Sequence, residues 1–186
     1  MNALMSARGH VILSHGMESG PNATKVTRLA AVAERMGFTS ERPDDEGIFD
    51  PLIRLQRLLP KIAAAPRPLI LVGSSIGAYV SGLASLQSAV DGLFLLAPPV
   101  RLPDIEPDLD LQAKRICIVH GWRDELIAPQ EVYELALRLR AQLHLYDSDH
   151  RLGDIVEDLE RDFGAFLGKF APASLPALMP AEVQSS

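Results

Sequence analysis

The sequence predicts an α/β protein: a three-layer α/β/α sandwich around a trimmed, mainly parallel sheet of six strands. Short apolar runs alternate along the chain with longer segments of helical periodicity, which is the pattern of strands joined by crossover helices. Runs such as Leu69–Val72 do not alternate between apolar and polar residues, as a strand with one solvent-exposed face does, and such runs are typical of a sheet covered on both sides. The 186 residues are also enough to bury a substantial core.

A single domain is expected over residues 1–170, because no linker or internal repeat interrupts the alternation of strands and helices. Residues 171–186 contain three prolines and no periodic apolar pattern, which predicts an irregular C-terminal tail. No segment approaches the length of apolar chain that spans a bilayer, so no membrane association is expected.

The first strand is expected at His10–Ser14, and a helix from about Ala23 to Met36 follows it. A weaker strand candidate lies at Phe38–Arg42. The next helix should begin at Pro51, because Asp50 is a favourable N-cap and proline is tolerated at the first helical position.

This second helix is expected to present an apolar stripe, and Pro60 is expected to kink or end it. A further helix begins directly after the strand at Leu69–Val72, and a loop is expected at Val100–Lys114. Asp154 and Glu157 are interpreted as a capping box for the final helix. The apolar stripe of the second helix comprises Leu52, Leu55, Leu59 and Ile62. The remaining strands are expected at Gly92–Leu96, Arg115–Val119 and Gln142–Tyr146, and a helix is expected to begin at Pro129. The inward-facing residues of the last helix are expected to be Ile155, Leu159, Phe163 and Phe166.

Composition excludes some classes of function. The net charge of −6 provides no basic surface for nucleic acid, so none is expected as a partner. Cys117 is the only cysteine, which excludes an internal disulfide and favours a reducing, cytoplasmic location. Its apolar neighbours predict a small buried core residue.

The segment Gly73-Ser74-Ser75-Ile76-Gly77 joins the buried strand directly to a helix. A strand, a Gly-x-Ser-x-Gly turn and a helix together are typical of a nucleophile elbow, in which a strained turn exposes the serine. Only Ser75 has glycine two residues away on both sides, so Ser75 and not Ser74 is the candidate nucleophile. A Gly/Ser-rich turn without chemistry is the alternative.

A serine hydroxyl needs a base to take its proton, and the imidazole base needs an acid to fix its tautomer. Asp124 follows the fifth predicted strand and His150 the sixth, and carboxyl ends of parallel strands meet at one edge of the sheet. Ser75, Asp124 and His150 therefore form a candidate catalytic triad in the order serine, acid, histidine. Glu125 is the fallback acid.

Other acids and histidines are less suitable. Asp91 begins a strand, at the edge of the sheet opposite the serine, and Asp147 and Asp149 are expected to shape a loop or to be solvated. His10 and His144 lie within strand patterns, and His120 is expected to shape the acid loop. A metal site built from His15, His120 and His150 is an alternative, but no pair has His-x-x-x-His spacing, so no metal or cofactor is expected.

An oxyanion hole requires backbone donors near the serine. Ile76 follows the nucleophile at a helix N-terminus, and Met17 lies in the loop after the first strand, so their N–H groups are the candidates. Candidates for contact with the substrate are His15, Trp122, Leu126 and Ile127, together with the Met17 side chain. The four apolar ones are equally well explained as packing residues, and His15 could simply hold its loop.

These motifs together resemble the α/β-hydrolase superfamily over about His10 to Leu167, and the segment from His15 to Pro21 resembles compact bacterial esterases of the YqiA-like kind. The chain has no room before His10 for the two antiparallel strands that usually begin this fold. The segment between Pro99 and Arg115, where many members insert a helical lid, is only a loop. The resemblance implies an open, lidless site that favours short or water-soluble acyl groups.

The leading hypothesis is a serine esterase that cleaves carboxylic esters or thioesters of small acyl groups, with a small molecule as its partner. One alternative is a catalytically weak binding or regulatory protein on the same fold, because fold does not guarantee function. Another is a peptide or C–C bond hydrolase that uses the same serine. The oligomeric state is not predicted.

Overall fold

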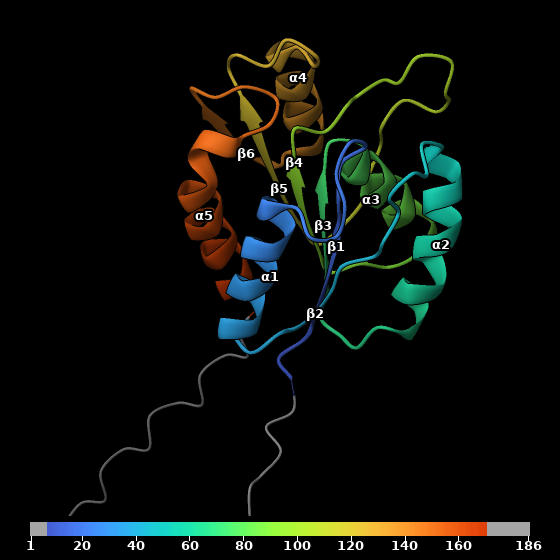
Figure 1. Ribbon diagram of the computed structural model, residues 1–186, viewed down its shortest axis with the longest axis vertical. Coiled ribbons are helices and arrows are strands. Elements are labelled where there is room, and N and C mark those ends of the chain that lie inside the picture. The colour runs from blue at the N-terminus through green and yellow to red at the C-terminus, as the bar shows by residue number, and fades with distance from the viewer. Residues whose placement is uncertain (1–6, 171–186) are drawn as a thin grey trace, which may run out of the picture.

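The computed structural model describes residues 7–170, which fold around one six-stranded parallel sheet (Figure 1). The strand order is β2-β1-β3-β4-β5-β6, and every neighbouring pair is parallel. The strands are β1 (His10–Ser14), β2 (Thr39–Glu41), β3 (Leu69–Ser74), β4 (Gly92–Leu96), β5 (Arg115–Gly121) and β6 (Gln142–Tyr146). The helices are α1 (Thr24–Arg35), α2 (Pro51–Ala64), α3 (Ile76–Gln87), α4 (Pro129–Leu139), the 3₁₀ turn η1 (Gly153–Ile155) and α5 (Val156–Gly168).

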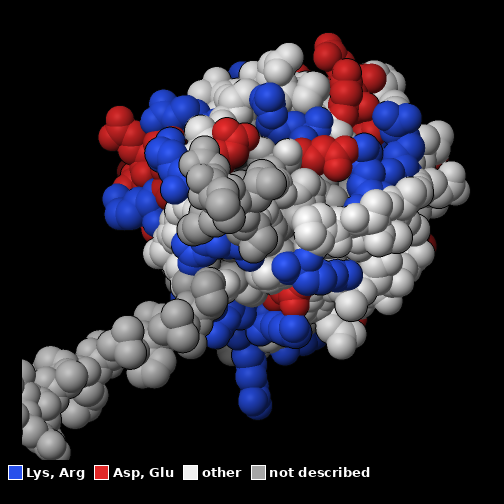
Figure 2. All heavy atoms as spheres, turned by 90° about the horizontal axis from the view of Figure 1, so that it is seen from below, with Lys and Arg blue, Asp and Glu red and all other residues white. Residues whose placement is uncertain are grey.

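Helices cover both faces of the sheet, so the predicted three-layer sandwich is confirmed (Figure 1). Alternate side chains of the strands enter two separate cores, because successive residues of a strand point to opposite faces. Leu69 and Leu71 of β3 pack with α2, α3 and α4, whereas Ile70 and Val72 pack with α1 and α5. The end of the sheet at which the strands begin, seen from below in Figure 2, carries basic and acidic side chains among uncharged ones.

The strand order reverses between β1 and β3. From β1 the chain crosses to β2 on one side and then returns to β3 on the other, and all later strands continue in that direction. The crevice above the carboxyl ends of β1 and β3 is therefore the topological switch point, where open parallel sheets bind their ligands.

The helix α3 is buried on all sides from Ile76 to Ser85. The predicted loop after β4 is present, and part of it covers the outer side of this helix. The Tyr79 hydroxyl donates to the Pro107 carbonyl at 2.6 Å, and Leu109 and Leu111 are buried against the core. A side chain on Gly82 would meet Leu109. Within residues 7–170 no lid helix lies between β4 and β5.

Two predictions about α2 were wrong in part. The helix does not end at Pro60 but continues to Ala64, because the proline removes a hydrogen bond only in the last turns and Ile62 beyond it is buried in the core. The buried stripe is also shifted: Leu52 is exposed, while Arg54 and Leu58 are buried. The N-cap was correct, since the Asp50 carboxylate accepts from the Leu52 N–H at 2.8 Å.

The predicted capping box of α5 was also wrong. The Asp154 carboxylate accepts hydrogen bonds from Ser148 and Arg123, and no side chain caps the helix. The inward-facing residues of α5 were predicted correctly, with Phe163 and Phe166 packed on Phe94. The predicted tail, 171–186, lies outside the described residues. No helix in residues 7–170 is both long and apolar enough to cross a membrane.

Candidate active site

Ser75 lies on a strained turn between β3 and α3, at the switch point of the sheet. Its backbone has φ 53° and ψ −120°, a conformation that residues other than glycine rarely adopt. The Ser75 N–H donates to the Leu96 carbonyl of β4 at 2.8 Å, and the Ser75 carbonyl accepts from the Ala78 N–H at 2.8 Å. Hydrogen bonds on both sides of the residue therefore hold the strained conformation.

The two glycines of the elbow are required by sterics. A Cβ atom on Gly73 would collide with the backbone of Gly77 and Ala78, which is the start of α3. A Cβ on Gly77 would collide with the backbone of Ser14 and His15, at the end of β1. The strand, the helix and the neighbouring strand approach so closely that only glycine fits at these two positions.

A continuous chain of hydrogen bonds joins the three residues of the predicted triad. The His150 Nε2 lies 3.0 Å from the Ser75 Oγ, and the His150 Nδ1 lies 2.7 Å from the Asp124 Oδ2. Because a carboxylate only accepts, Nδ1 carries the proton and Nε2 is free to accept the proton of the serine hydroxyl. The Asp124 carboxylate is buried, whereas the His150 ring is 19% exposed.

The Asp124 carboxylate is oriented by its own loop. Its Oδ1 accepts from the N–H groups of Leu126 and Ile127, both at 2.9 Å, which leaves Oδ2 for His150. The buried His120 ring donates from Nε2 to the Ile127 carbonyl at 3.0 Å and so closes the same loop. Burial lowers the pKa of His120, which keeps its ring neutral beside the triad.

The acid loop and the histidine loop support each other. The Arg123 Nε donates to the Asp147 carboxylate at 2.6 Å, and the Arg123 N–H donates to the Ser148 carbonyl at 2.9 Å. A Cβ on Gly121 would collide with the backbone of Ser148 and Asp149. Sequence reasoning did not identify the contribution of Gly121 or Arg123, because both act through contacts with the distant histidine loop.

The rival acids and histidines lie in other surroundings. Asp91 lies at the start of β4, where it binds the Leu69 N–H at 2.9 Å and Lys114 at 2.6 Å. Burial raises the pKa of this carboxyl, but these contacts together outweigh burial and lower it. Glu125 is exposed beside the acid loop, and Asp149 binds the N–H groups of its own loop. His10 and His144 bind Thr39 and Asp162 respectively.

The candidate oxyanion donors border the same cleft as Ser75. Ile76 is the first residue of α3, so its N–H has no partner inside the helix, and the positive end of the helix dipole lies there. Met17 lies in the loop after β1 and is 38% exposed. The cleft has a volume of about 1320 Å³ and is bordered by Met17, Ser75, Ile76 and His150.

The four candidate contact residues differ in exposure. Trp122 and Leu126 are 57% and 77% exposed and border the cleft, where they could meet an apolar group of a substrate. Ile127 is buried against the core. His15 is buried, and both ring nitrogens are occupied: Nδ1 donates to the Gly16 carbonyl at 2.7 Å, and Nε2 accepts from the Asp45 N–H at 3.1 Å. His15 therefore supports its loop.

The close approach of α3 to the end of β1 at Gly77 can be tested by substitution. Replacing Gly77 by alanine should lower the free energy of unfolding by about 2 kcal/mol or more, because the new Cβ meets backbone atoms that cannot move aside. The control is Gly164→Ala in α5, where the nearest atoms lie at 3.8 Å and alanine should add roughly 0.5–1 kcal/mol. Urea unfolding measures both, and a Gly77→Ala protein as stable as the parent would contradict the predicted close approach.

Comparisons with known proteins agree with this fold. No family model matches the chain, and no curated protein matches it. A solved structure from Xanthomonas campestris, assigned to the α/β-hydrolase superfamily, is 45% identical with a TM-score of 0.83, covering 87% of this chain and 99% of its own.

Two more distant structures share the fold. An α/β serine hydrolase without a lid, also from Xanthomonas campestris, is 24% identical with a TM-score of 0.71, covering 89% of this chain and 84% of its own. The mouse α/β-hydrolase domain-containing protein 10 is 17% identical with a TM-score of 0.73, covering 87% of this chain and 90% of its own. With 45% identity over nearly the whole of the first relative, the chain belongs to the α/β-hydrolase superfamily.

Proposed function

We propose that this hydrolase is a serine esterase that cleaves carboxylic esters or thioesters of small or short-chain acyl groups. The observation that supports it most is the hydrogen-bonded chain from the Ser75 Oγ through His150 to Asp124, at the edge of an open cleft. Nucleophile, base and acid lie in contact, which is the geometry that acyl transfer through a serine requires.

In the first half of the proposed reaction, the Ser75 Oγ attacks the carbonyl carbon of the ester while the His150 Nε2 takes its proton. Asp124 stays ionised and stabilises the imidazolium through Nδ1–H. The N–H groups of Met17 and Ile76 hold the negative oxygen of the tetrahedral intermediate. When the intermediate collapses, the bond to the leaving alcohol or thiol breaks and His150 returns the proton to it.

The second half releases the acyl group. Water enters the open cleft, His150 removes its proton, and the oxygen attacks the carbonyl of the acyl-serine. A second tetrahedral intermediate uses the same backbone donors, and its collapse returns the proton to Ser75 and frees the acid. No further co-reactant is needed.

The preference for short acyl groups rests on the cleft. The loop after β4 contributes Pro99 and Leu102 to the rim, while Leu109 and Leu111 of the same loop pack beside α3. Trp122 and Leu126 offer a small, exposed apolar border. A long acyl chain would therefore leave much of its surface in water, whereas a short one loses little.

We also propose a subfamily, a location and a domain boundary. A YqiA-like subfamily rests on the His15 to Pro21 segment alone. A cytoplasmic location is proposed because Cys117 is the only cysteine, so the chain has no internal disulfide. The Cys117 thiol is buried, and burial raises its pKa to about 12. We also infer one domain over residues 1–170, since two cores share a single sheet in the described part.

The role of Ser75 is tested with p-nitrophenyl acetate and butyrate. Ser75→Ala should lower kcat/KM by roughly three powers of ten or more, because the nucleophile is lost. Ser74→Ala, the adjacent serine with the same change in size, should keep activity close to that of the parent. Equal rates for the Ser75 variant and the parent would exclude the proposed mechanism.

The role of Asp124 is tested by exchanging its carboxylate for an amide. Asp124→Asn should lower kcat by about 10⁴-fold, because an amide that faces Nδ1 favours the wrong histidine tautomer. The matched control is Glu125→Gln, which removes the neighbouring exposed charge and should change kcat less than about threefold. Steady-state kinetics above neutral pH measure both, and similar effects in the two variants would contradict the assignment of Asp124.

A further inference from the structure

The candidate oxyanion donor in the loop after β1 must point into the cleft, and one peptide unit decides its direction. The Gly16 carbonyl and the Met17 N–H belong to the same planar trans peptide, in which the two groups point in opposite directions. Whatever holds the Gly16 carbonyl on one side of the loop therefore directs the Met17 N–H to the other side.

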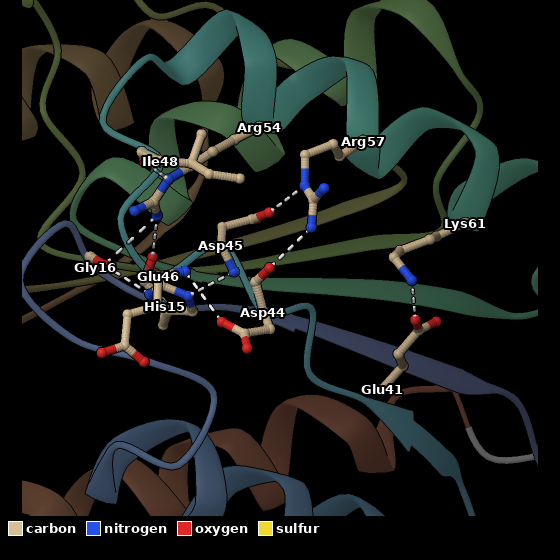
Figure 3. A network of polar contacts seen from close by, with 10 residues as sticks. All are labelled: His15, Gly16, Glu41, Asp44, Asp45, Glu46, Ile48, Arg54, Arg57 and Lys61. Atoms are coloured by element: carbon tan, nitrogen blue, oxygen red, sulfur yellow. Dashed lines mark hydrogen bonds and ion pairs between the residues drawn. The ribbon is translucent and has the colours of Figure 1, made fainter.

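Three side chains donate to that carbonyl. The His15 Nδ1 lies 2.7 Å from the Gly16 oxygen, the Ser19 hydroxyl 3.4 Å and the Arg54 Nη1 3.5 Å. The same Arg54 nitrogen donates to the preceding carbonyl, that of His15, at the shorter distance of 2.9 Å (Figure 3). Arg54 thus binds two successive carbonyls of the loop.

Arg54 is an unusual residue in its surroundings. It lies on α2, is 1% exposed, and its Nε donates to the Ile48 carbonyl at 2.6 Å. Within residues 7–170 no carboxylate lies within ion-pair distance of it, and its Nη2 has no hydrogen-bond partner. The carboxylate of Asp45 is bound instead by Arg57 at 2.8 Å.

A buried cation held only by carbonyl groups costs free energy. Burial lowers the pKa of the Arg54 guanidinium and the charge of Asp45 opposes this, but arginine remains protonated near neutral pH. Its charge polarises the peptides that it binds, and a polarised peptide is a stronger N–H donor. The buried charge lies in contact with the loop that carries the candidate oxyanion donor.

The helix α2 also supports the loop by a second route. The His15 Nε2 accepts from the Asp45 N–H at 3.1 Å, and the Asp45 carboxylate and Asp44 carbonyl are held by Arg57 (Figure 3). The His15 ring in turn donates to the Gly16 carbonyl. Arg54 acts directly on the loop, whereas Arg57 acts through two intermediates.

We propose that Arg54 is a positioning residue for the oxyanion hole: its guanidinium fixes the His15 and Gly16 carbonyls so that the Met17 N–H faces the developing oxyanion. The inference rests on the proposed esterase function and adds a residue that does not touch the substrate. It predicts that loss of Arg54 weakens stabilisation of the oxyanion and leaves binding of the ester in the ground state largely unchanged.

The test compares a p-nitrophenyl ester with the matching thionoester, in which sulfur replaces the carbonyl oxygen. Sulfur accepts hydrogen bonds weakly, so an oxyanion hole accelerates the ester more than the thionoester. The ratio of the two rates therefore measures how strongly the oxyanion hole stabilises the negative oxygen, and it does not depend on the fraction of folded enzyme. Arg54→Met removes the guanidinium at similar volume, and Lys61→Met on the same helix is the control, since Lys61 pairs with Glu41 away from the loop.

Arg54→Met should lower kcat for the ester by about 10- to 100-fold with KM within about threefold of the parent value, and the ester-to-thionoester ratio should fall about 10-fold. Arg54→Lys keeps the charge but loses the planar guanidinium with its several N–H donors. Its ester-to-thionoester ratio should lie between those of the parent and Arg54→Met, and this variant is decisive where Arg54→Met does not fold. Lys61→Met should keep the parent ratio.

An unchanged ratio in the folded Arg54 variants, in a parent whose hydrolysis depends on Ser75, would overturn the positioning role alone. A parent without Ser75-dependent hydrolysis would overturn the esterase function and the positioning role together. A fall in the ratio of equal size in Lys61→Met would also overturn the inference, because it would show that any change in α2 disturbs the site.

Discussion

The active-site end of the molecule depends on the strained backbone of Ser75. A positive φ at a serine costs on the order of 1–3 kcal/mol, and it persists because β4 binds the N–H and the first turn of α3 binds the carbonyl. Burial of α3 on all sides offsets this cost. The same turn sets the position of the Ile76 N–H and, through Gly77, brings α3 against the end of β1.

Pairs of contacts between segments distant in sequence hold the loops around this turn. Arg123 and Gly121 join the acid loop to the histidine loop, so that Asp124 and His150 are positioned as one unit. On the other side of Ser75, α2 holds the loop after β1 through Arg54 and the His15 ring. Contacts from outside each loop thus add to the hydrogen bonds within it, and such preorganisation is what catalysis by fixed dipoles requires.

Local patterns in the sequence were sufficient for the strands, the elbow and the order of the candidate triad, because strand burial and glycine spacing are properties of short segments. They were not sufficient where a residue distant in the sequence determines the burial or the hydrogen-bond partner of a side chain. Arg54 interrupts an apolar stripe, and its burial is explained by the carbonyls that it binds, those of Ile48 and of the remote loop after β1. Asp154 has the spacing of a capping residue but binds Ser148 and Arg123 instead. The strand order and the role of Gly121 likewise depend on contacts between separate segments.

Ser75 is proposed to be a nucleophile that is activated in the folded protein, and covalent trapping tests this role most directly. The native protein would be treated with a fluorophosphonate and examined by intact mass and by mass spectrometry of its peptides. We expect one adduct per chain, on Ser75, that does not form in urea-unfolded protein, because activation needs the folded contact with His150. No adduct on the native protein, or an adduct on another residue with Ser75 unmodified, would contradict this role of Ser75.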